Sequence, residues 1–200
     1  MSNFFEGALY SFGFLCLLLL IEYFTRLKKF PKEITRRVAH MASGLFGAVM
    51  GMILEPWVFI TFVLFFLLII CVSYARKFFS SIHGVKRKTY GELLLPLGIL
   101  AAYLIAGQNT TYTVSVLILA ISDPLAGLFG DLKLNEKIVV GSIVFLLVTL
   151  IILLVSFKAQ RLPVLFVIAA IITLVERFSN YGSDNLSIPL SASLLLKLLL

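Results

Sequence analysis

The sequence predicts an all-α polytopic membrane protein, a bundle of about seven to eight transmembrane helices at ~20 residues each. Hydrophobic residues make up 60% of the 200 residues, whereas soluble domains are nearer ~45–50% apolar. The mean hydropathy is +1.07, and the apolar residues fall in long runs separated by short polar loops. We therefore expect one integral membrane domain over residues 1–200, in which any chemistry is built from helix ends and short loops.

Each apolar run is interpreted as one span, with boundaries good to a few residues. No basic residue precedes Leu9, so the first run is expected to be a span and not a removed signal peptide. The last run is short and contains Pro189 and Lys197, so it either crosses fully, tilts or re-enters. The expected spans are Leu9–Phe24, Val38–Leu54, Val58–Tyr74, Leu93–Ala106, Tyr112–Phe129, Ile138–Phe157, Leu162–Val175 and Leu186–Leu200.

Basic residues are distributed unevenly between alternate loops. If the first span runs from outside to inside, the cytoplasmic loops hold every Lys and Arg except Lys158, Arg161 and Lys197. The positive-inside rule therefore predicts an external N-terminus and cytoplasmic basic loops, in the plasma membrane if the organism is prokaryotic. In a membrane protein the net charge of +7 favours anionic lipid head groups or a nucleotide as partners and not nucleic acid.

The strongest functional signal is an acid inside an apolar stretch, Ile121-Ser-Asp-Pro-Leu-Ala-Gly-Leu-Phe-Gly-Asp131. A charge within a membrane segment costs a few kcal/mol and usually serves a function. On a helix Asp123, Gly127 and Gly130 share one face, so the acid lies beside two residues with no side chain, where a helix or a phosphate can approach closely. Pro124 lacks a backbone N–H, which predicts a kink and a freed carbonyl beside the acid.

A basic pair and a histidine open the second expected span. Arg36, His40, Gly44 and Gly47 lie on one helical face. Arg36 and Arg37 could clamp a phosphate, and His40 could contact a phosphate or accept a hydroxyl proton. Alternatively, these residues have only structural roles. The arginines would then fix the orientation of the span in the membrane by the positive-inside rule, and His40 would pack within the bundle with its ring hydrogen-bonded.

The fourth span is preceded by three cations and a glycine, in the stretch Lys86-Arg-Lys-Thr-Tyr-Gly-Glu92. Cations beside a helix N-terminus, with its unpaired N–H groups and positive dipole end, form an anion-binding place. This favours phosphate binding by Lys88. Glu92 either stabilises the helix N-terminus or orients a basic residue or a metal.

The loop before the last span runs from Glu176 to Asp184-Asn185, with Pro189 four residues further on. Asp184 could simply cap the last helix. Together with Asp123, however, it would place two carboxylates on the same side of the membrane, and Mg²⁺ is usually held by one or two carboxylates plus substrate phosphates. In the predicted topology all four polar clusters lie at the cytoplasmic helix ends, which indicates a shared site.

These stretches resemble the CTP-dependent lipid kinases: dolichol kinase, phytol kinase and yeast-type diacylglycerol kinase, which are relatives of phosphatidate cytidylyltransferase. In that family an acid followed by small residues precedes a basic loop and a Gly-Ser that opens the next helix. The family also has a basic pair with a His, a Lys/Arg-x-Tyr-Gly-Glu followed by Pro-Leu-Gly, and a final Glu and Asp-Asn before a Pro. The residues that match the first of these motifs are Asp123, Ala126, Gly127, Gly130, Lys137, Gly141 and Ser142.

The chain departs from the family pattern at two places. Asp131 stands where the family usually has Arg or Lys, and Ile138-Val139-Val140 replaces a polar Ser-x-Glu. The resemblance nevertheless covers most of the chain, from Arg36 to Pro189.

The resemblance implies a CTP-dependent kinase that phosphorylates a membrane alcohol, a polyprenol, phytol or diacylglycerol, at the cytoplasmic face. Asp123 would hold Mg²⁺ with help from Asp184 or Asn185, and His40 would be the base. The triphosphate would be bound by cations and by small residues that let it approach, namely Arg37, Lys88, Lys137, Gly127, Gly130 and Gly141.

The sequence leaves two other functions open. Phosphatidate cytidylyltransferase, which makes a CDP-lipid, uses the same inventory of cations and metal ligands. A non-catalytic membrane protein or small transporter on the same scaffold would also carry intramembrane acids. The sequence names neither the acceptor lipid nor the oligomeric state.

Overall fold

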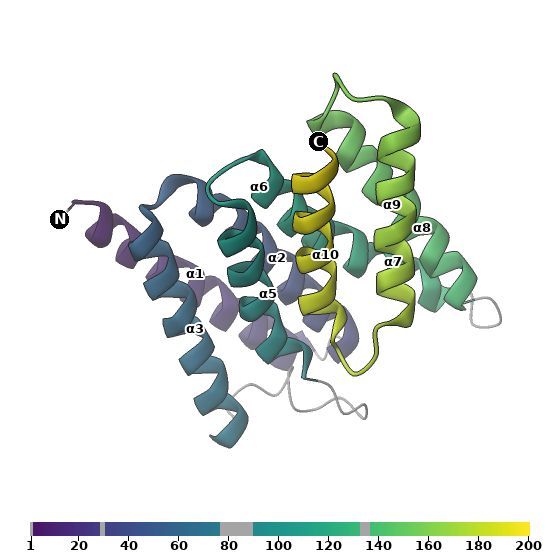
Figure 1. The fold of residues 1–200 in the computed structure, drawn as a ribbon. Helices are drawn as coiled ribbons and strands as arrows, with labels where there is room; N and C mark the ends of the chain where they lie inside the picture. The colour runs from purple at the N-terminus through teal and green to yellow at the C-terminus, as the bar shows by residue number, and fades with distance from the viewer. Residues whose placement is uncertain (1, 29–30, 77–89, 133–136) are drawn as a thin grey trace.

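The computed structural model describes residues 2–28, 31–76, 90–132 and 137–200 (Figure 1). Within these residues all regular structure is helical, and α6, the π-helical turn η1 and α7 follow one another without a break, which makes eight helical segments. The elements are α1 (Ser2–Lys28), α2 (Lys32–Ile53), α3 (Pro56–Arg76), α5 (Gly91–Ala106), α6 (Thr110–Leu117), η1 (Ile118–Ser122), α7 (Asp123–Leu132), α8 (Lys137–Ser156), α9 (Leu162–Phe178) and α10 (Asp184–Leu199).

The prediction of an all-α membrane bundle is confirmed, and each expected span coincides with one helical segment. Among the described residues, four helices are long and apolar enough to cross a membrane: Asn3–Thr25, Pro56–Ser73, Thr110–Leu132 and Ile138–Ser156. The third is 56% buried, whereas each of the other three is only 17% buried. The segment that carries Asp123 is therefore the most enclosed of the four.

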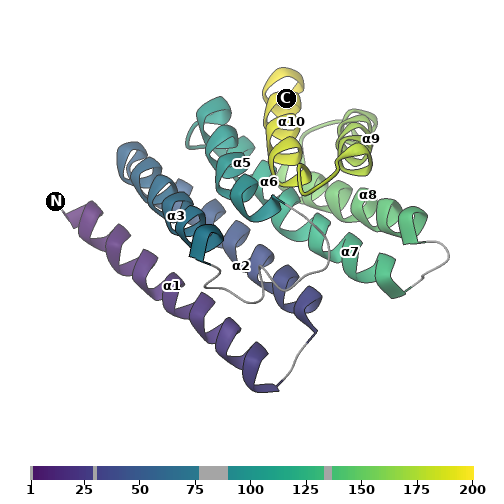
Figure 2. The same ribbon diagram turned by 90° about the horizontal axis from the view of Figure 1, so that it is seen from below.

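The helices form two layers (Figure 2). One layer contains α1, α2, α6–η1–α7 and α8 side by side, and the other contains α3, α5, α10 and α9. Apolar side chains fill the space between the layers, among them Tyr112, Phe145, Ile168 and Ile188. Tyr112, which is fully buried, donates its hydroxyl hydrogen bond to the Gly47 carbonyl oxygen at 2.6 Å.

The last helix runs parallel to α5 from its first turn to its last. At one end the Asn185 side-chain amide donates to the Gly91 carbonyl oxygen (2.8 Å), and at the other Lys197 donates to the Ile105 carbonyl oxygen (2.5 Å). The two helices have 16 residues each. α10 therefore extends along the whole length of α5.

Gly98 permits the close packing of these two helices. A Cβ at this position would overlap the Asn185 backbone carbonyl oxygen and would lie 2.8 Å from Pro189 Cγ. Because Asn185 belongs to the polar cluster predicted from the sequence, a glycine in the apolar middle of α5 fixes the position of a site residue.

We predict that Gly98→Ala destabilises the protein by about 1–3 kcal/mol, the usual cost of overpacking, because backbone must move. The melting temperature in detergent measures this. Gly13→Ala is the matched control, since a Cβ there meets nothing within 4 Å, and it should be neutral or stabilise by up to ~1 kcal/mol. Equal melting temperatures for the two variants would contradict the packing described here.

Candidate functional site

The polar clusters converge at one end of the bundle, where α2 and α10 begin and α7 and α9 end (Figure 1). They surround a cavity of about 540 Å³. Its charged and titratable lining residues are Glu33, Arg36, Arg37, His40, Asp123, Asp131, Glu176, Arg177 and Asp184. Three of the four clusters that were expected to share one site therefore line one cavity, whereas the cluster at residues 86–92 lies mostly outside the described residues.

A backbone irregularity lies directly before Asp123. In the π-helical turn Ile118–Ser122 the Leu119 carbonyl would accept from the residue five positions later, which is Pro124 and has no N–H. That carbonyl is satisfied instead by His40 of α2, whose Nε2 lies 3.3 Å from it. The freed carbonyl predicted from Pro124 is thus present, and its partner is the histidine of the site.

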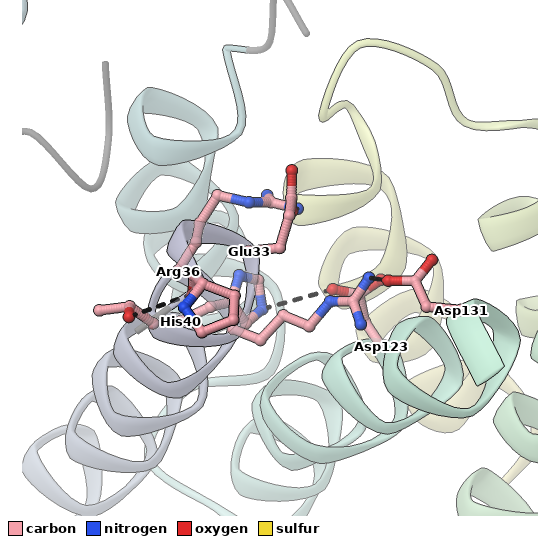
Figure 3. Close-up of polar contacts among 8 residues, drawn as sticks. Glu33, Arg36, His40, Asp123 and Asp131 are labelled. Atoms are coloured by element: carbon pink, nitrogen blue, oxygen red, sulfur yellow. Dashed lines mark hydrogen bonds and ion pairs between the residues drawn. The ribbon is translucent and has the colours of Figure 1, made fainter. Parts of the chain in front are cut away.

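His40 also faces the acid. Its Nε2 lies 3.7 Å from Asp123 Oδ2, and the two side chains are 11% and 24% exposed (Figure 3). When the Nε2 proton is donated to the Leu119 carbonyl, Nδ1 carries the lone pair of the neutral ring. The contact with Leu119 therefore sets the tautomer that can accept a proton at Nδ1.

Arg37 and Asp131 form an ion pair across the cavity, with Nη2 2.5 Å from Oδ2 (Figure 3). The guanidinium lies against Gly127, where a Cβ would come within 2.9 Å of Arg37 Cζ. The absence of a side chain at Gly127 therefore leaves room for the Arg37 guanidinium. Asp131, a departure from the family pattern, is the residue that pairs with Arg37.

Two further carboxylates lie at the ends of α9 and α10, beyond the predicted apolar spans. Burial raises the pKa of Glu176 to about 7, and the carboxylates of Asp123 and Asp184 contribute to this rise. Burial, together with the Asp123 carboxylate, raises the pKa of Asp184 to about 6. Asp184 is the first residue of α10, after the N-cap Ser183, and its Oδ1 accepts a hydrogen bond from the Asn185 N–H in the first turn (2.9 Å).

Asn185 is 5% exposed and connects α10 to α5. Its Nδ2 donates to the Gly91 carbonyl oxygen, which fixes the orientation of the amide. Its Oδ1 is buried and has no hydrogen-bond partner among the described residues. Buried acceptors without a donor are rare in proteins and require an explanation.

Most of the predicted site residues line the cavity. Lys88 lies outside the described residues, and so does the side chain of Lys137, whose backbone opens α8. The structure brings together Arg37, His40, Asp123, Gly127, Gly130, Gly141, Asp184 and Asn185.

Several residues that line the cavity are missing from the expected site, among them the charged residues Arg36, Asp131 and Glu176. Arg36, which the sequence suggested only as a possible phosphate clamp, lies one helical turn before His40 on the same face, and that spacing could have identified it. Glu176 follows the apolar part of α9 directly, which is a signal for a helix-end acid. The pairing of Asp131 with Arg37 joins residues 94 positions apart, and no local pattern indicates it.

The donor set fits a magnesium ion that arrives with a phosphate ligand. Among the described residues no group of three or more His, Cys, Asp or Glu side chains has the arrangement of a metal site. Asp123 and Asp184 are nevertheless close enough for the first carboxylate to raise the pKa of the second. Two acidic side chains with room for phosphate suit Mg²⁺, which takes one or two carboxylates plus substrate phosphates and waters.

The chain is similar to a known lipid kinase. It is 27% identical over 197 residues to a phytol kinase from Synechocystis sp., an alignment that covers 88% of this chain and 84% of that kinase. No family model matches the chain. No solved structure matches it either.

We predict that Gly127→Ala displaces Arg37 from its pair with Asp131 and lowers the melting temperature less than Gly98→Ala does. The added methyl at Gly127 meets a guanidinium, whereas the methyl at Gly98 meets backbone, and overpacking against backbone is the costlier change. Gly13→Ala again serves as the control. A melting temperature for Gly127→Ala as low as that of Gly98→Ala would contradict the packing of Arg37 on this glycine.

The ligand-free protein should lose stability as the pH rises. Glu176 and Asp184 have higher pKa values folded than unfolded, so the folded chain binds more protons. Their contribution is fully present below the unfolded pKa values of ~4 and is lost as the pH rises toward ~7. We expect the melting temperature to fall over this range and Glu176→Gln to reduce the slope, with the exposed Glu6→Gln as control. A melting temperature independent of pH would contradict this.

Proposed function

We propose that the protein is a CTP-dependent lipid kinase that phosphorylates the hydroxyl of a membrane alcohol, with a prenyl alcohol such as phytol or a polyprenol as the favoured acceptor. One observation carries the proposal. Acids, arginines and a histidine from four helices meet in a single polar cavity within an otherwise apolar bundle. The similarity to a phytol kinase supports the same reaction class.

The cations of the cavity would bind the triphosphate. Arg36 and Arg37 come from the first turns of α2 and line the cavity, and guanidinium groups match phosphate oxygens with paired hydrogen bonds. Lys88 and Lys137 would add positive charge from the adjoining loops. In this arrangement a phosphate replaces Asp131 as the partner of Arg37, so Asp131 keeps the guanidinium in position while no nucleotide is bound.

Asp123 and Asp184 would hold the magnesium ion of the nucleotide, whose charge offsets the charge that develops on the phosphates. Phosphoryl transfer depends chiefly on position and charge neutralisation, so the protein needs few groups. The acceptor oxygen forms a bond to the γ-phosphorus while the bond from that phosphorus to the β–γ bridging oxygen breaks. The hydroxyl proton passes to Nδ1 of His40, and the nucleoside diphosphate leaves.

The distribution of basic residues supports a cytoplasmic site. The polar end carries Arg36, Arg37 and Arg177, whereas Lys158 and Arg161 lie between α8 and α9 at the opposite end. By the positive-inside rule the polar end faces the cytoplasm, where nucleotides are available.

We predict that Asp123→Asn lowers turnover at least ~100-fold, the scale of losing one electrostatic contact to the transition state, while the protein remains folded. The assay measures transfer from CTP to phytol with the melting temperature alongside. Glu6→Gln, which changes a carboxylate far from the cavity, is the control and should retain full turnover. Unchanged turnover in Asp123→Asn would refute its role.

The products of the same assay separate kinase from cytidylyltransferase. A lipid monophosphate with CDP supports the proposal. A CDP-lipid with pyrophosphate, formed from phosphatidate, would overturn it in favour of cytidylyl transfer.

A further inference from the structure

A second cavity, of about 180 Å³, lies between the two layers of the bundle. It is lined by α1 and α2 on one side and by α3 and α5 on the other. Aromatic rings pack along it, and Phe14 and Phe46 stack with their centroids 4.2 Å apart. Its apolar lining includes Phe14, Phe46, Met50, Phe59, Phe62 and Phe66.

The apolar cavity adjoins the polar one. Arg36, His40 and Asn185 line both. From His40 the lining continues along one stripe of α2 to Leu54, a distance of about 21 Å at 1.5 Å per residue. A molecule in this cavity would therefore be long, apolar and polar at the end that meets His40.

The junction offers one unsatisfied acceptor. Asn185 Oδ1 is buried without a hydrogen-bond donor among the described residues, and its amide cannot turn without losing the bond to Gly91. A hydroxyl group supplies the missing donor. An alcohol on the end of a hydrocarbon chain therefore satisfies both the orphaned oxygen and the apolar lining.

The size of the apolar cavity favours one chain over two. At ~10–15 Å³ for each water-sized position, 180 Å³ accommodates on the order of a dozen methylene-sized groups. That is enough for the part of one prenyl chain nearest the hydroxyl and too little for the paired acyl chains of diacylglycerol.

We propose that this cavity binds the hydrocarbon chain of a single-chain prenyl alcohol. The alcohol's hydroxyl donates to Asn185 Oδ1 until the phosphate donor binds, and it then rotates to donate to Nδ1 of His40, which also lines the cavity. This proposal rests on the proposed function for the identity of the phosphate donor. The acceptor site is assigned from the apolar cavity and Asn185 alone. In this proposal Asn185 binds the acceptor alcohol and does not help to hold the metal ion.

The contact between α1 and α2 shows which residues of the two helices lie at the same level along the cavity. The Thr25 and Thr35 hydroxyls are 3.0 Å apart, which fixes the register of the antiparallel pair α1 and α2. Ser11 lies 14 residues before Thr25, so it stands level with the far end of the cavity near Met50, and it lines the cavity. Ser43 lines it one turn from His40, near the polar mouth.

Photolabelling tests the site without requiring turnover. A prenyl alcohol with a diazirine at its tail would be irradiated with the wild-type protein, and the adducts would be mapped by mass spectrometry. The expected adducts lie on Phe62 and Phe66, on the inward face of α3. Adducts confined to Phe65 and Leu68, which are 50% and 60% exposed on the same helix, or no adducts at all, would overturn the proposal.

Two filling variants test chain length. Ser43→Phe should reduce labelling by prenyl alcohols of every length at least tenfold, whereas Ser11→Phe should exclude long chains and leave short ones. Val49→Phe adds the same ring to the exposed face of α2 and should change neither. Equal labelling in all three variants would refute the assignment.

The Asn185→Ala variant distinguishes a hydrogen bond between Asn185 and the alcohol hydroxyl from a contact between Asn185 and the metal ion. It should raise the KM for the alcohol about three- to tenfold, the scale of one hydrogen bond, and leave Mg²⁺-nucleotide affinity unchanged. Weaker nucleotide affinity with an unchanged alcohol KM would overturn the hydroxyl role.

The two proposals can fail separately. If no nucleotide supports phosphorylation while the photolabel maps to the inward face of α3, the kinase function fails and the alcohol site stands. If the protein is an active kinase and the photolabel maps elsewhere, the alcohol site fails and the kinase function stands.

Discussion

The arrangement depends on the cost of carrying charged and polar groups inside an apolar helix bundle. An unpaired carboxylate or backbone carbonyl at membrane depth is expensive, and the chain offsets this cost with partners from other helices. The Leu119 carbonyl, which Pro124 and the π-helical turn leave without a backbone donor, is satisfied by His40. The same histidine faces Asp123. One backbone irregularity thus joins α2 to the segment that carries the acid.

Close helix packing brings the remaining groups to the same place. Gly98 allows the Asn185 backbone to lie against α5, and Gly127 allows the Arg37 guanidinium to lie against α7. The result is a polar cavity and an apolar cavity that meet at Arg36, His40 and Asn185. A reaction between a nucleotide from water and an alcohol from the bilayer requires such a junction, because its two substrates prefer different solvents.

The sequence predicted the helices well, because apolar runs and loop polarity report directly on the membrane. It also predicted the polar end, since alternation of the spans sends Asp123, His40 and Asp184 to one side, and it anticipated the carbonyl freed by Pro124. It did not predict the pair of Arg37 with Asp131 or the apolar cavity. The ion pair and the cavity both depend on which helices pack against one another, and hydropathy does not predict which helices are neighbours. The roles predicted for Lys88 and Lys137 remain predictions, since the side chains of both lie outside the described residues.

The central claim is that the polar cavity binds CTP with magnesium, and the melting temperature of the purified protein tests it most directly. A ligand that binds only the folded state raises stability by about 2.7 kcal/mol at a hundredfold excess over its dissociation constant. We expect a rise with CTP and Mg²⁺ together, a smaller rise without Mg²⁺, and little change with ATP or GTP. No rise with any nucleotide would contradict the kinase function while leaving the fold as described.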